Sequence, residues 1–205
     1  MVSKIELDSI ANDCSYNIRE VISKEILNAL KCNRDIIVLC IGTDRSTGDS
    51  LGPLVGEKLK FLKRDRIHIM GDLDNPIHAK NLKENLNFIS ENFSFPFIIA
   101  VDACLGSIHS VGNVIIQSKP ITPGSALNKD LPPVGDLSIT GVVNISGSLE
   151  FMVLQNTRLS VVMKLATAIS NGIYHSIIKT VGSNHKTHVN PNNAVKELLS
   201  KIDLQ

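Results

Sequence analysis

Two aspartates follow apolar segments of strand length, and this placement suggests acid–base chemistry. Asp49 lies in the Gly-rich segment IGTDRSTGDSLG, and Asp102 directly follows the apolar run PFIIAV. Ligands of parallel α/β sheets bind just past the C-terminal ends of the strands, so carboxylates on neighbouring strands meet at one edge. Repulsion and burial keep one of two close carboxylates protonated, while the other ionises and activates water. The pair therefore predicts hydrolysis of an amide bond.

Each aspartate also has a purely structural interpretation. Asp49 precedes an apolar helical segment, where a carboxylate commonly caps the helix N-terminus. Asp102 is equally suited to form a turn after its strand. Because both carboxylates follow predicted buried strands, function is favoured modestly over these alternatives.

The turn that carries Asp49 holds further candidates. Gly42 and Gly48 bracket it, Asp44 is a turn residue that could serve as a third acid, and Arg45 is a solvated residue that could anchor a substrate carboxylate. A phosphate-binding loop is disfavoured, because the turn is one residue too long and has an aspartate in place of the phosphate-binding lysine. A carboxylate aimed at a phosphate would repel it.

Alternating strand and helix signals position these residues. Apolar runs typical of buried strands occupy residues 36–41, 66–73 and 96–101, and two further strands are expected at 112–117 and 137–145. Helical spacing covers residues 16–30, 51–62, 78–92 and 148–178, with a break near 156–157. The pattern predicts an α/β fold: a three-layer α/β/α sandwich, phosphorylase/hydrolase-like, with a mostly parallel or mixed sheet of about five strands.

Composition limits the remaining choices. With 205 residues and 43% hydrophobic content, we expect one domain over residues 1–182 and a polar tail with a short helix over 183–205. The net charge of +1 gives no global field for nucleic acid or an anionic membrane. The apolar runs are too short to span a membrane, and four scattered cysteines without a leader segment predict a cytoplasmic protein.

Other reactive side chains have simpler interpretations. Cys104 and His109 could form a thiol site, but a cysteine in an apolar segment is usually inert packing. His185 and His188 have metal-ligand spacing without acidic or cysteine companions, which favours a polar tail. The sequence therefore predicts no metal site and no cofactor.

Two segments resemble the motifs of known peptidases. IGTDRSTGDSLGPLVGEKL resembles the first motif of the spore germination protease, and FIIAVDACLG resembles its second. The hydrogenase maturation endopeptidases carry a similar Gly-turn-acid-Gly segment. The segments KPITPGSALNKDLPPVGDLSITGVVN and LQNTRLSVVMKLA closely resemble the sporulation protein YyaC family, which is germination-protease-like.

The resemblance implies specific site residues. The two essential aspartates of the germination protease fall on Asp49 and Asp102, and its glycine turn falls on Gly42 and Gly48. The loop with Pro123, Gly124 and Ser125 resembles a segment that lies beside the protease site. Where the hydrogenase endopeptidases place a histidine ligand, this chain has Asn144, Ser146 and Ser148, so nickel recognition does not carry over.

Three functional hypotheses follow. The first is a cytoplasmic aspartate-dependent endopeptidase of a sporulation or germination programme, which the resemblance places in the forespore or spore interior with small acid-soluble spore proteins as substrates. The second is a catalytically inactive protease-fold protein that binds peptides or another sporulation factor. The third is a metal-dependent hydrolase that uses Asp49, Asp102 and another oxygen ligand. Each hypothesis implies a protein or peptide partner. The sequence does not decide whether the chain forms a homo-oligomer.

Overall fold

A six-stranded sheet forms the centre of the protein. The computed structural model describes residues 4–123 and 131–182. The strands are β1 (Ile5–Asp8), β2 (Ile36–Cys40), β3 (Ile67–Met70), β4 (Phe97–Gly106), β5 (Asn113–Gln117) and β6 (Leu137–Ile145). The α-helices are α1 (Cys14–Lys31), α2 (Leu51–Leu59), α3 (Leu82–Asn92), α4 (Glu150–Gln155) and α5 (Leu159–Val181). Two single-turn 3-10 helices are η1 (Gly48–Ser50) and η2 (Ile108–Ser110).

The sheet is mixed, as the sequence predicted. Its strand order is β1-β5-β6-β4-β2-β3. The pairs β2–β3, β2–β4 and β4–β6 are parallel, and the pairs β5–β6 and β1–β5 are antiparallel. The parallel pairing of β2 with β4 is the condition under which Asp49 and Asp102 were expected to meet.

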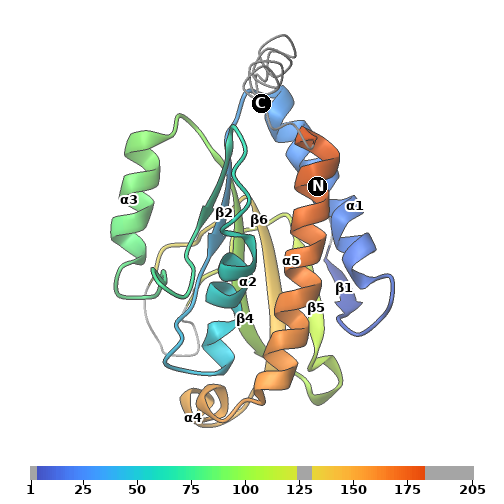
Figure 1. Cartoon of the computed structure of the whole chain (residues 1–205). Helices are drawn as coiled ribbons and strands as arrows, with labels where there is room; N and C mark the ends of the chain where they lie inside the picture. The colour runs from blue at the N-terminus through green and yellow to red at the C-terminus, as the bar shows by residue number, and fades with distance from the viewer. Residues whose placement is uncertain (1–3, 124–130, 183–205) are drawn as a thin grey trace, which may run out of the picture.

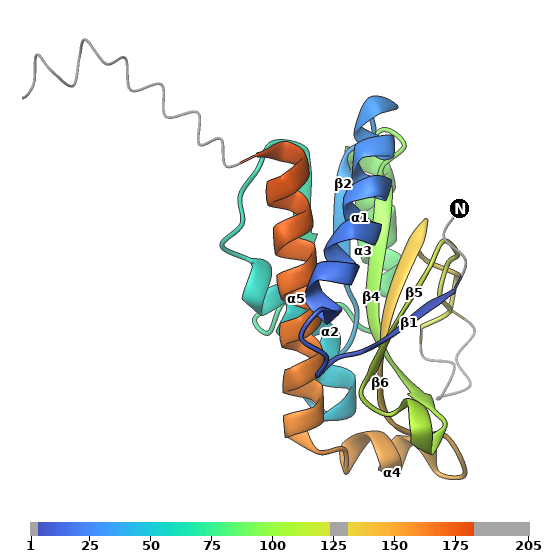
Figure 2. The same ribbon diagram turned by 90° about the vertical axis from the view of Figure 1, so that its right-hand side faces the viewer.

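Helices cover both faces of the sheet (Figures 1 and 2). Helix α3 packs on one face, where Leu82 and Ile89 join a core with Ile37, Leu39 and Ala100. The other face carries α1, α2 and α5 over a larger core. Every residue of β2 is buried because it lies between these two layers, which explains its continuous apolar run. The predicted three-layer α/β/α architecture is confirmed.

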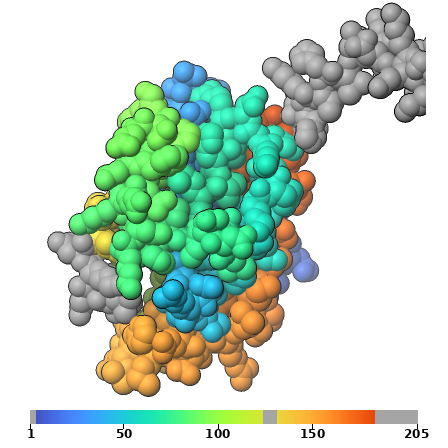
Figure 3. Space-filling model, turned by 60° about the vertical axis from the view of Figure 1, so that its left-hand side comes forward, coloured from blue at the N-terminus to red at the C-terminus, as the bar shows by residue number. Residues whose placement is uncertain are grey.

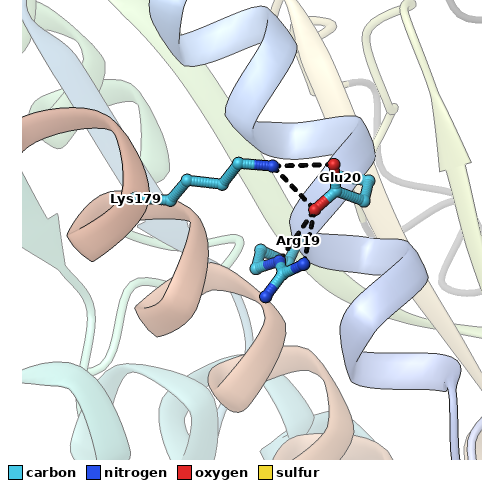
Figure 4. A network of polar contacts seen from close by, with 3 residues as sticks. All are labelled: Arg19, Glu20 and Lys179. Atoms are coloured by element: carbon cyan, nitrogen blue, oxygen red, sulfur yellow. Dashed lines mark hydrogen bonds and ion pairs between the residues drawn. The ribbon is translucent and has the colours of Figure 1, made fainter.

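Helices α1 and α5 lie side by side on the outer layer. Ile18, Ile22 and Ile26 repeat at intervals of four along α1 and are fully buried, as expected for one apolar helix stripe. At the rim of this contact, Lys179 on α5 donates to both carboxylate oxygens of Glu20 at 2.7 Å, and Arg19 contacts Glu20 Oε1 at 2.7 Å (Figure 4). The apolar stripe packs α1 against α5, and the Lys179–Glu20 pair adds a polar contact between the two helices at the rim.

The sequence missed strand β1 and underestimated β4. Strand β1 has four residues and pairs only with β5 at the sheet edge. Strand β4 continues five residues beyond the predicted end at 101, because it stays paired with β6 as far as Gly106. The predicted helix break is confirmed: α4 ends at Gln155 and α5 begins at Leu159.

No helix within residues 4–123 and 131–182 is long and apolar enough to cross a membrane. The expected tail at 183–205 lies outside the described residues.

Candidate active site

The turn after β2 holds Asp49 against the end of the sheet. Beyond Cys40, Ile41 forms a parallel bridge with Ile77, and the Gly42 N–H donates to the Ile77 carbonyl at 2.7 Å. The chain then turns back, so that the Thr43 N–H donates to the Asp49 carbonyl at 3.0 Å. Asp49 is thereby fixed by backbone hydrogen bonds that close the turn.

Two glycines allow this close approach. Gly42 has a φ of +148°, and a Cβ there would lie 2.0 Å from the Asp49 carbonyl oxygen. A Cβ on Gly48 would lie 2.8 Å from Leu154 Cδ2 and 3.0 Å from the Leu154 carbonyl oxygen. Backbone packed this tightly leaves no room for a side chain at either position. The glycines support the site by positioning Asp49.

Asp102 lies inside β4 rather than after it. Residue pairing between β2 and β4 ends at Cys40 and Val101, whereas Asp102 is still paired with Thr140 of β6. Asp102 is therefore the first β4 residue beyond the end of β2. Side chains alternate along a strand, so Asp102 shares the sheet face of Ala100, which belongs to the core beneath α3. Asp102 therefore still lies at the C-terminal end of β2, as expected, although the predicted end of its own strand β4 was wrong.

The structural interpretations of both aspartates are wrong. The N-cap of α2 is Ser50, and Asp49 precedes it within η1. Ser50 Oγ donates to the Thr47 carbonyl at 2.7 Å and so makes no cap bond. Asp102 forms no turn, because it lies in a strand. Asp49 is thus not the cap of α2, and Asp102 is not a turn residue.

The two carboxyl groups titrate differently. Burial raises the pKa of the Asp102 carboxyl to about 8; the Ala103 N–H, which donates to its Oδ1 at 2.8 Å, opposes this rise, and the Asp49 charge adds to it. Burial also raises the pKa of Asp49, and hydrogen bonding by the Ser46 hydroxyl lowers it. The large shift belongs to Asp102, so this group keeps its proton at neutral pH.

Both aspartates line a first cavity of about 480 Å³. Its wall is mainly apolar and includes Ile41, Ala79, Pro123 and Phe151. Figure 3 shows the face where the segment before α3, the turn after β2 and α4 come together. The volume lies in the range of small-ligand sites, about 300–1,000 Å³.

A second cavity of about 470 Å³ begins at the same two aspartates. Its wall is more polar than that of the first cavity and includes Gln117, Lys119 and Thr140 beside Leu105 and Ile121. Among the described residues that line the two cavities, Asp49 and Asp102 alone are common to both. The carboxyl pair therefore stands between two hollows of different character.

The other predicted site residues fall into three groups. Gly42, Arg45 and Pro123 line the first cavity. Gly48 lies beneath Asp49, and Asp44 is exposed and lines neither cavity. Gly124 and Ser125 lie outside the described residues.

His78 lines the first cavity and was missed by the sequence analysis. Its Nδ1 accepts the Lys80 N–H at 3.3 Å, so the neutral ring carries its proton on Nε2. The bridge between Ile41 and Ile77 brings this residue to the site. No local signal in the sequence reveals that long-range pairing.

The thiol hypothesis finds little support. Cys104 lines the second cavity and is partly buried, not fully buried as the apolar segment suggested. Burial raises the pKa of its thiol, although a hydrogen bond with Thr140 lowers it. The thiolate is the nucleophilic form, so this environment disfavours it. His109 lies in η2, is exposed and lines neither cavity.

Asn144 has an anchoring role. It is one of the residues that this chain has where the hydrogenase endopeptidases place a histidine ligand. Its Nδ2 donates to the Val153 carbonyl and to Thr157 Oγ1, both at 3.2 Å. Asn144 therefore fastens α4 to the end of β6.

A cluster of acidic groups lies away from the aspartate pair. Within the described part of the chain, the ligand atoms of Glu57, Asp72 and Asp74 lie within 4.8 Å of one another. Lys60 pairs with Glu57 and Asp74 and so already balances part of this charge. Among the residues that the structure describes, Asp49 and Asp102 form no such cluster.

Comparisons with known proteins identify relatives of the chain. The family model described as "Protein of unknown function (DUF1256)" matches residues 7–172. The "Uncharacterized protein YyaC" of Bacillus subtilis (strain 168) is 51% identical over 156 residues, which cover 76% of this chain and 75% of that protein. The expected resemblance to YyaC is confirmed.

Among solved structures, the chain matches the NiFe hydrogenase maturation protease HycI from Thermococcus kodakarensis KOD1. It is 20% identical, the superposition covers 70% of this chain and 92% of that one, and the TM-score is 0.44.

Proposed function

The chain belongs to the family described as "Protein of unknown function (DUF1256)", and we propose that it is an endopeptidase that hydrolyses peptide bonds with Asp49 and Asp102. The difference between the two carboxyl groups supports this most directly. Asp102 holds a proton up to about pH 8, and Asp49 lies beside it on the wall of the same two cavities. Acid–base catalysis at neutral pH needs one protonated and one ionised group.

The two aspartates have separate roles in this mechanism. In this mechanism the Asp49 carboxylate is the ionised group and removes a proton from the attacking water. Water adds to the carbonyl carbon and forms a tetrahedral intermediate. Asp102 then gives its proton to the leaving nitrogen, and the C–N bond breaks. Macroscopic titration belongs to the coupled pair rather than to either group alone.

The developing oxyanion needs a hydrogen-bond donor. The N–H groups of Gly42, Thr43 and Arg45 already donate within the turn region, so the turn backbone at these positions is occupied. The Nε2–H of His78 is a donor on the wall of the first cavity. We assign the stabilisation of the oxyanion to this group.

Small acid-soluble spore proteins are the proposed substrates, within a sporulation or germination programme. This assignment depends on the resemblance of the two aspartate segments to the motifs of the germination protease. Peptide recognition without hydrolysis is the second candidate. Phe151 is exposed and lines the first cavity, and its sequence neighbours Leu149 and Met152 are also exposed. These side chains favour this candidate, because exposed apolar patches commonly mark binding surfaces.

The experiment compares four proteins: the unmodified chain, Asp49→Asn, Asp102→Asn and Asp44→Asn. Each is incubated with purified small acid-soluble spore proteins, with and without a chelator, and cleavage is followed by mass spectrometry. Loss of either paired carboxylate should abolish cleavage, whereas Asp44→Asn, an exposed carboxylate of the same turn, should retain it. Absence of cleavage by the unmodified chain, or equal cleavage by all four, would refute the proposal.

A further inference from the structure

The two cavities meet at the carboxyl pair, and this arrangement favours an extended ligand. They share Asp49 and Asp102 and otherwise have different lining residues. A ligand whose reacting bond lies over the carboxyl pair has one hollow on each side of that bond. Compact ligands would fill one cavity and leave the other empty.

The two hollows differ in chemistry. In the first, Ile41, Ala79 and Phe151 offer apolar surface. The second offers hydrogen-bonding groups and charges of both signs. These are Gln117, Lys119, Thr122, Thr140 and Glu150. An apolar side chain gains from burial in the first, whereas a polar side chain finds partners in the second.

Helix α4 forms part of both walls. Phe151 and Gln155, four residues apart, line the first cavity, and Glu150 and Leu154, also four apart, line the second. Residues at this spacing share a helix face. Leu154 also packs under Gly48 beside Asp49. The helix therefore presents neighbouring faces to the two hollows while it supports the carboxyl pair.

We propose that the site binds an extended peptide segment across Asp49 and Asp102, with an apolar side chain in the first cavity and a polar side chain in the second. This inference rests on the proposed function for the position of the reacting bond. It adds a requirement on the ligand: a peptide with an apolar half and a polar half fits the two cavities better than one that is apolar or polar throughout.

The test measures binding of three fluorescein-labelled dodecapeptides by anisotropy. One has a Leu-rich half and a Gln- and Ser-rich half, the second is Leu-rich throughout, and the third is Gln- and Ser-rich throughout. The first should bind about tenfold more tightly than either of the others, which is the size of effect that a single well-buried anchor side chain gives. An affinity of the first peptide no greater than that of the other two would overturn the inference.

Two exposed phenylalanines provide a matched pair of variants. Phe151, which is 49% exposed, lines the first cavity, whereas Phe88 is 51% exposed and lies on α3 outside both cavities. Phe151→Ser should remove most of the preference, and Phe88→Ser should keep it. Lys119→Ala, at an exposed position of the second cavity, should also reduce the preference. If Phe151→Ser behaves as Phe88→Ser does, the apolar subsite is refuted.

Failure of this inference is distinguishable from failure of the proposed function. Cleavage of all three peptides at equal rates would leave the endopeptidase proposal intact and refute the two subsites. A strong preference in binding, without cleavage of any peptide or spore protein, would support the two subsites and refute hydrolysis.

Discussion

The position of Asp102 in the fold favours the neutral form of its carboxyl group. It extends past the end of β2, so Asp49 can approach it, while the neighbouring strand β6 still pairs with its backbone. Local sequence sufficed to select both aspartates, because each follows a recognisable apolar segment. It could not reveal the protonation difference, which depends on burial by residues far apart in the chain.

The pH dependence of cleavage should be bell-shaped. The alkaline limb should fall with an apparent pKa of about 8, because Asp102 must hold a proton. The acid limb should lie above the ordinary Asp value of 3.8, because burial raises the pKa of Asp49 and this group must be ionised. Rates of peptide cleavage between about pH 4 and about pH 10 test this. A rate that continues to rise beyond the alkaline limb would contradict the assigned roles.

Asp102→Asn should stabilise the folded protein, increasingly so as pH rises. In the unfolded chain the carboxyl ionises near 3.8, whereas in the fold its pKa is about 8. The favourable contribution of the protonated group is therefore complete below the lower value and is lost as pH rises through the upper one. Asparagine stays neutral throughout. Above about pH 8 the variant should gain roughly 1–3 kcal/mol, the usual cost of burying a poorly compensated polar group.

Urea denaturation at an acidic and an alkaline pH measures this gain. Asp44→Asn serves as the control, because Asp44 is exposed in the same turn. A stability difference between Asp102→Asn and the unmodified chain that is the same at both pH values would argue against a protonated Asp102 in the folded chain.

At the scale of elements, the turn after β2 is the part that the sequence described best. Its apolar strand and flanking glycines are local signals, and the structure shows both glycines in close backbone contacts. Long-range pairing explains the misses. Strand β1 has only four residues, IELD, which alternate between apolar and polar, and it forms through pairing with β5. The end of β4 is fixed by its pairing with β6. The arrival of His78 at the site depends on the bridge between Ile41 and Ile77.

Gly42→Ala should impair catalysis more than folding. Its Cβ would lie 2.0 Å from the Asp49 carbonyl oxygen, so the turn must move and carry Asp49 with it. A displacement of about 1 Å commonly lowers catalytic rates about 100-fold. Overpacking of this kind costs about 1–3 kcal/mol of stability.

Gly147→Ala is the matched control, because a Cβ there meets nothing within 4 Å. Rates of peptide cleavage and thermal unfolding are measured for both variants. If Gly42→Ala cleaves peptides as rapidly as Gly147→Ala does, the turn does not position a catalytic group.

At the scale of the whole molecule, stability and catalysis occupy different regions. Helices α1 and α5 pack over one face of the sheet, and α1 contributes no residue to either cavity. The described polar contacts between these helices include the partly exposed Glu20 and Lys179, whereas Ile18 is fully buried. Apolar burial rather than surface charge should therefore hold the outer layer in place.

Ile18→Ala and Glu20→Gln test this division. Removal of the buried side chain leaves a cavity and should cost about 2–5 kcal/mol. Loss of the Glu20 charge should change the free energy of unfolding little, because solvent and salt screen an exposed pair. Both variants, assayed below their unfolding temperatures, should keep the pH profile of the unmodified chain, since neither residue lines a cavity. An altered pH profile in Ile18→Ala would show that the outer helices influence the carboxyl pair. A larger stability loss in Glu20→Gln than in Ile18→Ala would show that charge, rather than apolar burial, holds α1 against α5.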